Sequence, residues 1–371
     1  MERLRTWRAA TTCQDESEAV EEVRQQVGEV GNLKAVIFFC SPRYDRERLA
    51  AALQKAFSCP IIGCTSAGQI GPRGFQPEGL CAVALASDEL DVHTYLIEPL
   101  GEVRARALEV AARVRQEIPG DLPQFGLVLV DGLSMAEEEL VSTLHLALDG
   151  MSLVGGSAGD DLAFERTFVY GHGVFRRDAA VLAVFRTSLP FQTLKFQHFV
   201  PTARKLVATA AYPDRRLVEE FNGKRAARAY AEAVGVPVEG LDASVFSAHP
   251  LLIEMAGEYH VRSIQRVNPD ASLSFYCAID EALVFTVGQG VDALETADLA
   301  MQGMRAAMGG EPQVVIGCDC ILRRLELEQA GLSEQVGALF AKNRVLGFST
   351  YGEQWNGMHM NQTFTGVALG G

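Results

Sequence analysis

Three histidines in this chain have neighbours that suit a bound planar cofactor. His198 lies between two phenylalanines in KFQHFVP, His249 precedes Pro250 in FSAHPLL, and His359 is flanked by methionines in GMHMNQ. An imidazole nitrogen can ligate iron, and aromatic or thioether neighbours provide the apolar surroundings that a haem prefers. For each histidine taken singly, a core residue satisfied by one hydrogen bond is the more common explanation.

A glycine-rich turn near one of these histidines occurs three times in the chain. Residues 60–86 align without a gap with residues 344–370, so that Gly63, Gly68 and Gln69 match Gly347, Gly352 and Glu353. The third copy, LVGGSAGDD at 153–161, matches more loosely. In it, Ser157 aligns with Ser66 and Asp160 aligns with Gln69.

Each copy follows an apolar run and a segment with helical periodicity. The runs are AVIFFC (35–40), GLVLV (126–130) and VVIG (314–317), and each is typical of a strand that is buried on both faces. Strand, helix and strand in this order predict a βαβ unit with parallel strands. The glycine turn then lies at the carboxyl end of a strand, where open α/β sheets bind ligands. A tight turn without a ligand explains the glycines as well.

The sequence therefore predicts an α/β (α+β) protein of two domains with mixed sheets. Repeated βαβ units would end in Gly-Ser/Thr-Gly turns, and residues 251–287 would form an antiparallel meander. We predict an N-terminal helical extension at 1–31, a first domain at 32–221 and a second domain at 222–371.

No sequence signature of catalysis is present. The chain has no Gly-x-Ser-x-Gly elbow, His-Glu-x-x-His motif, phosphate loop or dinucleotide fingerprint. Glu353 and His359 could act as an acid–base pair. The position of Glu353 is taken by Gln69 and Asp160 in the other copies, however, and an amide that replaces a carboxylate indicates hydrogen bonding. We therefore expect that the protein is not an enzyme.

Composition limits the partners. The formal net charge of −14 argues against binding to nucleic acid or to an anionic membrane, because both need clustered Lys and Arg. No apolar run reaches the ~20 residues that a membrane span needs. Eight scattered cysteines without a Cys-x2-Cys pair resemble buried free thiols in a reducing compartment, so we expect a cytoplasmic protein.

Longer blocks of sequence resemble a known family. The chain is similar to the bacterial FIST sensory proteins, which are named for a role in signal transduction, over nearly its whole length. The blocks with the clearest similarity are GCTSAGQI (63–70), HPLLIEMAGEYHVRSIQRVNPDASLSFYCAID (249–280), GCDCILRRLE (317–326) and GFSTYGEQWNGMHMNQTFTGVAL (347–369). They cover both an N-terminal and a C-terminal FIST domain.

Within that family, the chain most resembles the nitric-oxide-sensing branch, NosP. Ser349 stands where that branch suggests Asn, a departure that leaves Tyr351, Gly352, Glu353 and Gln354 intact. The resemblance implies a non-covalent haem b, held by a histidine, whose ferrous iron binds nitric oxide. It also implies a partner that the protein regulates, either a histidine kinase or a cyclic-di-GMP enzyme. A homodimer is compatible with this role.

The resemblance leads to two sets of candidate residues. His198 and His249 rank first as iron ligands, and His359 fits better in a pocket shared by the whole family. Arg262, with Arg323 or Arg324, would pair with haem propionates. The alternative is a haem-free FIST receptor for a small polar metabolite such as an amino acid, with a pocket formed by the glycine turns, Tyr351, Glu353 and Asn361.

Overall fold

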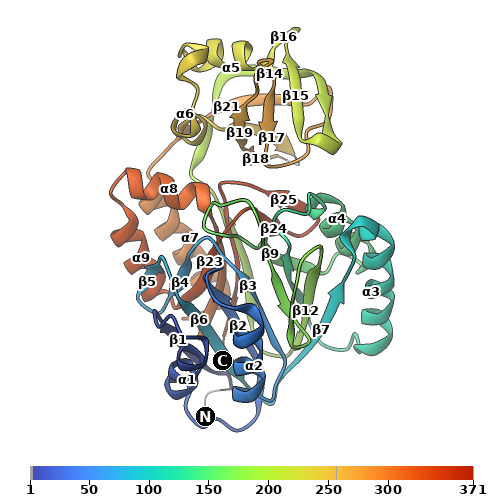
Figure 1. Ribbon diagram of the computed structural model, residues 1–371, viewed down its shortest axis with the longest axis vertical. Helices are drawn as coiled ribbons and strands as arrows, with labels where there is room; N and C mark the ends of the chain where they lie inside the picture. Colours follow the sequence, from blue (N-terminus) through green and yellow to red (C-terminus); the bar gives the residue numbers. More distant parts are fainter. Residues whose placement is uncertain (1–2, 256, 371) are drawn as a thin grey trace.

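The computed structural model describes residues 3–255 and 257–370. In this part of the chain the strands form three six-stranded sheets and one eight-stranded sheet. The six-stranded sheets lie in a lower body, and the eight-stranded sheet lies in an upper lobe, residues 199–290 (Figure 1). The predicted α/β class with mixed sheets is confirmed.

The body contains three units of similar topology. The elements of the first unit are β1 (Arg5–Thr11), α1 (Glu16–Val27), β2 (Leu33–Cys40), α2 (Arg46–Ala56), β3 (Ile61–Thr65), β4 (Gln69–Gly71), β5 (Gly74–Gln76) and β6 (Leu80–Ala86). Strands β2 and β3 are parallel and joined through α2, as predicted for a βαβ unit, and β6 returns antiparallel between β1 and β2.

The second unit repeats this order. It contains β7 (Leu90–Ile97), the short helix η1 (Leu100–Glu102), α3 (Val103–Glu117), β8 (Gln124–Val130), α4 (Glu137–Ala147), β9 (Ser152–Ser157), β10 (Val169–Gly171), β11 (Val174–Arg176) and β12 (Ala180–Thr187). Strands β8 and β9 are parallel, and β12 lies antiparallel between β7 and β8.

The third unit is interrupted by the upper lobe. It contains β13 (Phe191–Phe196), α7 (Ala293–Met308), β22 (Val314–Cys320), α8 (Ile321–Gln329), α9 (Ser333–Lys342), β23 (Val345–Thr350), β24 (Glu353–Trp355), β25 (Met358–Met360) and β26 (Phe364–Leu369). Strands β22 and β23 are again parallel. The upper lobe is inserted between β13 and α7, where the first two units have only short connections.

The upper lobe is the predicted antiparallel meander, extended by an N-terminal hairpin. Its elements are β14 (Phe199–Tyr212), η2 (Pro213–Arg215), β15 (Leu217–Phe221), β16 (Lys224–Arg225), α5 (Ala226–Val234), η3 (Val238–Gly240), α6 (Ala243–Ala248), β17 (Leu251–Met255), β18 (Glu258–Arg262), β19 (Ile264–Val267), β20 (Leu273–Phe275) and β21 (Val284–Gly290). Every pair of neighbouring strands in it is antiparallel.

The three units exchange hairpins in a closed cycle. Hairpin β4–β5 pairs with β23 of the third unit, β24–β25 pairs with β9 of the second, and β10–β11 pairs with β3 of the first. Backbone hydrogen bonds repeat this cycle at the strand ends. They run from Ala67 N to Ser349 O (3.0 Å), from Gly159 N to Thr65 O (3.0 Å) and from Tyr351 N to Ser157 O (3.3 Å).

These bonds make Thr65, Ser157 and Ser349 equivalent. The alignments of Ser157 with Ser66 and of Asp160 with Gln69 were therefore wrong, and the hairpin that begins at Gln69 and Glu353 in the other units begins at Val169 in the second. The slip has a physical origin, because the second unit carries a loop at 158–168 where the other units turn directly into their hairpins. The first and third copies have turns of equal length, so their sequences align without a gap. The longer loop of the second copy shifts its alignment with the other two.

The segment 1–31 differs from the expected helical extension. It contains α1, but β1 precedes that helix and pairs with β6 along its whole length, so the described part of the segment completes the first sheet. The expected boundary at 221/222 divides the chain into two consecutive segments. In space, residues 291–370 return to the body, and the separate unit is the upper lobe (Figure 1).

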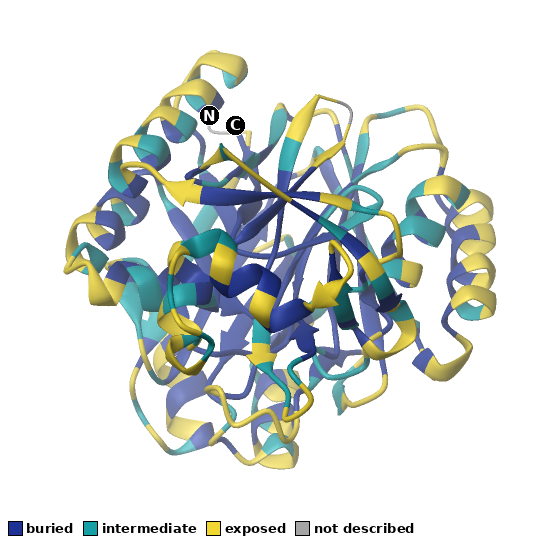
Figure 2. Ribbon diagram, turned by 90° about the horizontal axis from the view of Figure 1, so that it is seen from above, coloured by how far each residue is buried: buried dark blue, intermediate teal, exposed yellow. Residues whose placement is uncertain are grey.

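The sheets pack against one another, and the helices cover them. Seen from above, buried strands fill the middle of the molecule, and the helices at its rim turn exposed faces outwards (Figure 2). The inner faces of all three six-stranded sheets contribute to one apolar cluster, with Phe39 stacked on Phe348 at 4.4 Å between ring centroids. Within the described residues, no helix is long and apolar enough to span a membrane.

Candidate functional site

The carboxyl end of β22 carries a buried ion pair. Asp319 and Arg323, four residues apart, have fully buried side chains, and Nε of Arg323 donates to Oδ1 of Asp319 over 2.8 Å. Nη1 of Arg323 donates to Nδ1 of His198 (2.9 Å). Because arginine only donates, the proton of His198 lies on Nε2, which donates to Glu326 Oε1 over 2.8 Å. Both ring nitrogens of His198 are therefore engaged.

Glu353, the first residue of β24, is buried beside this pair. Its Oε2 accepts a hydrogen bond from the backbone N of Thr363 (3.1 Å), and the carboxyl also contacts the Cys320 thiol. Burial raises the pKa of Glu353 well above its usual range, with the nearby Asp319 carboxylate acting in the same direction. Glu353 therefore favours the neutral form, in which it can donate a hydrogen bond.

Besides Glu326, whose Oε2 has no partner either, four side chains here carry polar atoms without a partner in the described part of the chain. These side chains, which we call the β22–β23 cluster, are Asp319, Arg323, Ser349 and Glu353. Asp319 and Ser349 are direct neighbours in the parallel register of β22 and β23. The unpaired atoms are Oδ2, Nη2, Oγ and Oε1, respectively. Buried polar atoms in proteins nearly always have partners, so an ordered water or a ligand would supply the partners here.

The other face of β24 carries a hydrogen-bonded chain. Nδ1 of His359 lies 3.3 Å from Oε1 of Gln354, and Nε2 of Gln354 donates to Ser157 Oγ over 3.1 Å. Ser157 Oγ in turn donates to Glu137 Oε1 over 3.3 Å. Burial lowers the pKa of His359, which favours the neutral ring. Within the described residues, Nε2 of this ring has no partner.

The packing of His359 explains one of the repeated glycines. A Cβ atom at Gly352 would lie 2.2 Å from Cε1 of the His359 ring, which is closer than any real contact. The position therefore needs glycine because the imidazole lies directly against the backbone.

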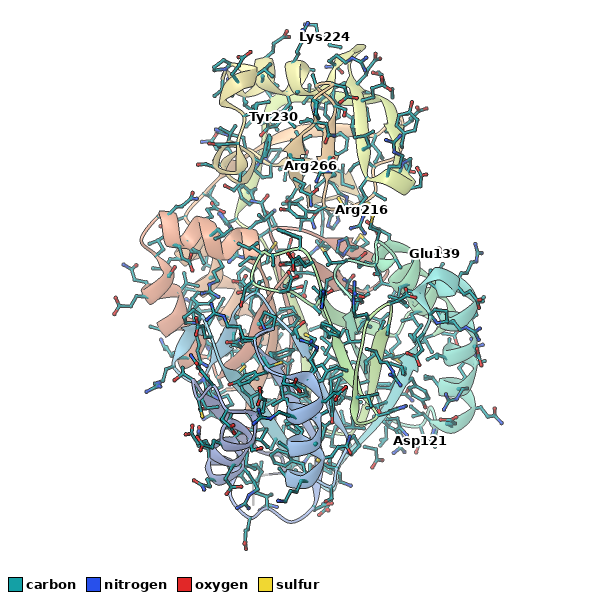
Figure 3. The ribbon with its side chains drawn as sticks, viewed as in Figure 1. Asp121, Glu139, Arg216, Lys224, Tyr230 and Arg266 are labelled. Carbon is teal, nitrogen blue, oxygen red and sulfur yellow. The ribbon has the colours of Figure 1, made fainter. Side chains whose placement is uncertain are left out.

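Arg216 links the upper lobe to this chain of hydrogen bonds. It lies on the underside of the upper lobe, facing the body (Figure 3). Its Nη2 lies 2.6 Å from Glu137 Oε2 and 2.8 Å from Glu138 Oε2, and its Nη1 donates to the Tyr276 carbonyl (2.9 Å). Burial alone would raise the pKa of Glu138, but the positive charge of Arg216 and the hydrogen bond from the backbone N of Ala278 lower it. Glu138 is therefore ionised, and it also accepts a bond from the upper-lobe backbone at Ala278 (2.7 Å).

A second set of contacts joins the two parts at the end of β18. Nη1 of Arg262 donates to the carbonyls of Val261 (3.0 Å) and His359 (3.4 Å). The neighbouring Ser263 donates from its backbone N to Asn361 Oδ1 (3.3 Å) and from Oγ to Gln362 Oε1 (2.8 Å). Hydrogen bonds from the upper lobe therefore fix the position of β25, the strand that carries His359.

Tyr351 connects the junction with the long loop of the second unit. Its hydroxyl donates to the Asp160 carboxylate and accepts a hydrogen bond from the backbone N of Leu162 (2.8 Å). Its ring stacks on Phe164 at 4.7 Å between centroids, and Phe164 in turn lies 6.4 Å from Tyr276 of the upper lobe.

The structure thus brings four of the six predicted site residues to the junction of body and upper lobe: Arg262, Tyr351, Glu353 and His359. His198 adjoins the β22–β23 cluster through Arg323. His249 is the C-cap residue of α6; it is half-buried, and its ring forms no hydrogen bond within the described residues. Across residues 3–255 and 257–370, no group of three or more His, Cys, Asp or Glu side chains is arranged to hold a metal ion.

The sequence analysis missed Asp319, Arg216 and Glu137, and it considered Arg323 only as a partner of haem propionates. Asp319 and Arg323 had a usable signal, since a carboxylate at the end of an apolar strand precedes an arginine one helical turn later. Arg216 and Glu137 had none, because they are 79 residues apart and meet only through the fold.

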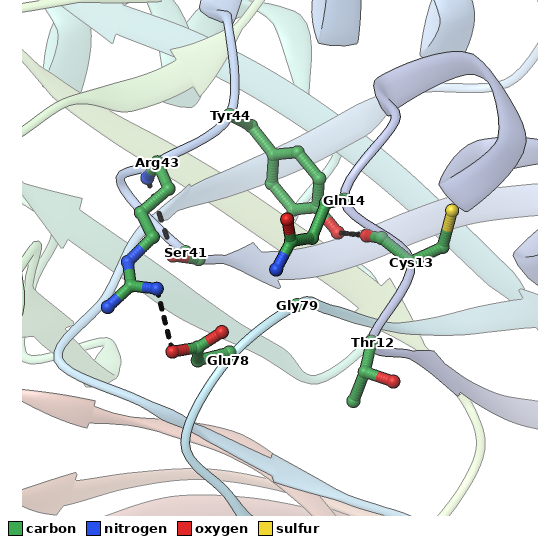
Figure 4. A pocket seen from close by; sticks show the side chains of 8 residues that line it. All are labelled: Thr12, Cys13, Gln14, Ser41, Arg43, Tyr44, Glu78 and Gly79. Atoms are coloured by element: carbon green, nitrogen blue, oxygen red, sulfur yellow. Dashed lines mark hydrogen bonds and ion pairs between the residues drawn. The ribbon is translucent and has the colours of Figure 1, made fainter.

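The first unit has a small pocket at the position that corresponds to His198. The pocket has a volume of about 150 Å³ and lies beside Cys13 and Tyr44 (Figure 4). The Tyr44 hydroxyl donates to the Cys13 carbonyl, and Arg43 pairs with Glu78 at 2.8 Å.

The strand register identifies the equivalent residues. Leu80 pairs with Thr11 and Cys40 in the first sheet, and Phe364 pairs with Phe196 and Asp319 in the third. Counting two residues from Thr11 and Phe196, and four from Cys40 and Asp319, gives the equivalent pairs. These pairs are Cys13 with His198, and Tyr44 with Arg323.

Comparison with known proteins gives two family matches and one relative. Residues 34–224 match the FIST N domain and residues 226–356 match the FIST C domain. A protein of Methanocaldococcus jannaschii described as "Uncharacterized protein MJ1623" is 24% identical over 230 residues. That match covers 59% of this chain and 43% of the relative, so the chain spans less than half of the relative's length.

Proposed function

The chain belongs to the FIST family, whose domains imply a sensory role in signalling, and we propose that it senses a small polar metabolite such as an amino acid. The protein would act as a receptor and not as an enzyme. The observation that carries the proposal is the β22–β23 cluster with its unpaired buried atoms. Leaving a buried polar group unpaired costs about 1–3 kcal/mol, so a ligand that supplies partners recovers free energy here.

The cluster has the chemistry to bind a zwitterion. The free Nη2 of Arg323 can donate to a carboxylate, and the free Oδ2 of Asp319 can accept from an ammonium group. Neutral Glu353 and Ser349 add a donor or an acceptor beside them. Charged groups of both signs at one buried position favour a ligand that carries both charges over a simple ion.

The contacts between body and upper lobe provide a route for the signal. Ligand binding beside Glu353 would act on its neighbour Gln354, on the other face of β24, and so on the path through Ser157 to Glu137. Arg216 holds the upper lobe to that carboxylate. A change in this path would alter how the upper lobe sits on the body, and a partner histidine kinase or cyclic-di-GMP enzyme would respond to that change.

Ser349→Ala tests the ligand site with little risk to the fold. The variant removes a hydroxyl that has no partner among the described residues, so it should leave stability unchanged or slightly higher while weakening ligand binding about 5- to 10-fold. Binding of the twenty amino acids would be measured by calorimetry. Ser333→Ala is the matched control, because it removes another buried hydroxyl without a partner in residues 3–255 and 257–370, and this one lies outside the junction. If no amino acid binds, or if both variants bind equally well, the proposal is wrong.

Haem binding with nitric oxide sensing is a second proposal, and it rests on His249. The ring of His249 is half-buried and makes no hydrogen bond in residues 3–255 and 257–370, so it could serve as a ligand. His198 does not fit as it stands, because Arg323 and Glu326 engage both of its nitrogens. A haem at His249 would supply the iron to which nitric oxide binds.

An absorption spectrum separates the two proposals. The protein would be titrated with hemin, reduced with dithionite and exposed to nitric oxide. A Soret band that shifts with nitric oxide and is lost in His249→Ala, but kept in His93→Ala, would support haem sensing. A spectrum that shows only free hemin would eliminate haem sensing and leave the polar-metabolite proposal untouched.

A further inference from the structure

A second polar pocket lies outside the junction, between the first and second units. It has a volume of about 480 Å³ and is formed by the start of α2 and the loop after β9. Three arginines line it: Arg43, Arg46 and Arg166. Arg43 pairs with Glu78, whereas Arg46 and Arg166 form no ion pair within residues 3–255 and 257–370. The pocket therefore presents two guanidinium groups without a carboxylate partner in the described chain.

Arg46 is held by its side chain, whereas Arg166 is held by its backbone and has an exposed side chain. The guanidinium carbon of Arg46 lies 4.4 Å from the centroid of the Phe168 ring, a cation–π contact that fixes the side chain. The backbone at Arg166 is fixed by Asp160, whose carboxylate also accepts bonds from the backbone N of Phe164 and Glu165 at 2.7 to 2.9 Å. Because these bonds and that to Tyr351 engage both Asp160 oxygens, its negative charge is largely compensated.

The loop that carries Arg166 has an unusual backbone. Asp161, Leu162 and Phe164 have φ values of 55°, 66° and 53°, in the left-handed region that side chains rarely adopt. Such a conformation costs about 1–3 kcal/mol per residue and persists only when its surroundings impose it, which is common at ligand sites. In this loop the Asp160 carboxylate and the Tyr351 hydroxyl impose it.

The two arginines that the first unit contributes to the pocket, Arg43 and Arg46, are not needed for the fold of that unit. Arg43 is three residues beyond Cys40, and the equivalent residues in the second and third units are Leu133 and Leu322. Both leucines pack in a small apolar cluster with Tyr351. The first unit thus has a cation where its counterparts have a packed apolar side chain.

Arg46 follows the same pattern. It begins α2, six residues beyond Cys40, and the residue six beyond Val130, Ala136, lies directly before α4 and contributes to apolar packing. The same topology therefore forms without either arginine.

We propose that this pocket binds a small phosphate ester with hydroxyl groups beside its phosphate, such as a sugar phosphate. The planar guanidinium groups of Arg46 and Arg166 would donate paired hydrogen bonds to the phosphate oxygens. Three carboxylates line the pocket, Asp160, Asp161 and Glu165, and of these Asp161 and Glu165 would accept hydrogen bonds from the neighbouring hydroxyls. A simple anion would meet these carboxylates without such compensation, so the ester binds more tightly than inorganic phosphate does.

Titration calorimetry at constant ionic strength tests the proposal with ribose 5-phosphate, inorganic phosphate and ribose. We expect saturable binding of ribose 5-phosphate, at least 5-fold weaker binding of inorganic phosphate and no binding of ribose. Arg46→Ala and Arg166→Ala should each weaken the binding of ribose 5-phosphate about 10-fold or more. Arg228→Ala is the matched control, because Arg228 is an exposed arginine in the upper lobe.

Asp161→Asn separates the roles of the two charges. It should strengthen the binding of inorganic phosphate, because a negative charge is removed, and reduce the advantage of ribose 5-phosphate. Circular dichroism would show that each variant is folded. Absence of ribose 5-phosphate binding to the wild-type protein at millimolar concentration would overturn the proposal. An equal loss of affinity in Arg228→Ala would overturn it as well.

Discussion

The first and third units place different chemistry at equivalent positions of one topology. Gln69 and Glu353 begin equivalent hairpins, and both side chains are fully buried. The amide of Gln69 can satisfy all its hydrogen bonds, donating to the carbonyls of Gln76 and Glu78 and accepting from Ser66 and Ser41. Glu353 has one bonded oxygen and one without a partner in the described residues.

Tyr44 and Arg323 show the same contrast between a satisfied side chain and one with an unpaired atom in the described residues. Tyr44 of the first unit makes a single neutral hydrogen bond to the Cys13 carbonyl. Its counterpart Arg323 is charged and bonded to Asp319 and His198, and its third nitrogen has no partner among the described residues. The first unit is therefore a satisfied structural version of the site, and the third unit is an incomplete version that a ligand can complete.

The largest expected change in stability comes from removing the buried charge of Arg323. Arg323→Met should lower the free energy of unfolding by about 3–5 kcal/mol, because it leaves the Asp319 carboxylate buried without its partner. Urea unfolding of this variant would be compared with Tyr44→Phe, which should lose only about 1 kcal/mol. Arg323→Lys, which keeps the charge, should fall between the two. Equal losses in Arg323→Met and Tyr44→Phe would show that the two units do not differ in this way.

Introducing the third unit's chemistry into the first should also destabilise. Gln69→Glu removes the amide that donates to the carbonyls of Gln76 and Glu78, and it adds a buried acid. We expect a loss of about 1–3 kcal/mol at pH 7, with a smaller loss at pH 5, where the new carboxyl is more readily protonated. Chemical unfolding at the two pH values would measure both numbers. A loss that does not depend on pH would contradict a buried carboxyl at this position.

The reverse change, Glu353→Gln, should raise the free energy of unfolding relative to wild type as the pH rises. Because burial raises the folded-state pKa of Glu353, the folded protein binds this proton more tightly than the unfolded chain. The resulting stabilisation is complete below the unfolded-state pKa of about 4.3, and it is lost as the pH rises through the folded-state value. Glu353→Gln removes this loss and should gain about 1 kcal/mol at pH 8 relative to pH 5. A parallel pH dependence of variant and wild type would refute the assignment.

The smallest effect is expected in the pocket of the first unit. Arg43→Ala removes an ion pair with Glu78 whose side chains are 67% and 42% exposed, so stability should change by less than about 0.5 kcal/mol. Thermal unfolding at low and high salt would measure it. A larger effect would mean that Arg43 carries a structural role that its counterpart Leu322 fills by packing.

Much of the fold was accessible from the sequence because its signals are local. The apolar runs at 35–40, 126–130 and 314–317 identified β2, β8 and β22, and each was followed by the expected helix and parallel strand. The turn before Glu353 was correctly placed for the same reason. The exchange of hairpins was not accessible, because the partner of β4 is chosen by strand edges that lie more than 270 residues away in the chain.

The candidate site was accessible only in part. Glu353, His359 and Tyr351 lie in one short, distinctive stretch, and the sequence singled them out. Asp319 and Arg323 lie in the block GCDCILRRLE, where the arginines were considered only as partners of haem propionates. The engagement of both nitrogens of His198 depends on Arg323 and Glu326, more than 120 residues later, and no local pattern reveals it.

The sequence by itself determined the repeated βαβ units, their glycine turns and the family, because periodicity and short-range turn chemistry are properties of neighbouring residues. The tertiary structure decided which repeat carries the unpaired polar atoms and which is closed by its own hydrogen bonds. The physical reason is that hydrogen-bond satisfaction depends on every group that the fold brings within about 3 Å, and most of those groups come from other units. Gln69 and Glu353 look alike in the sequence, and their surroundings make one structural and the other a candidate for binding.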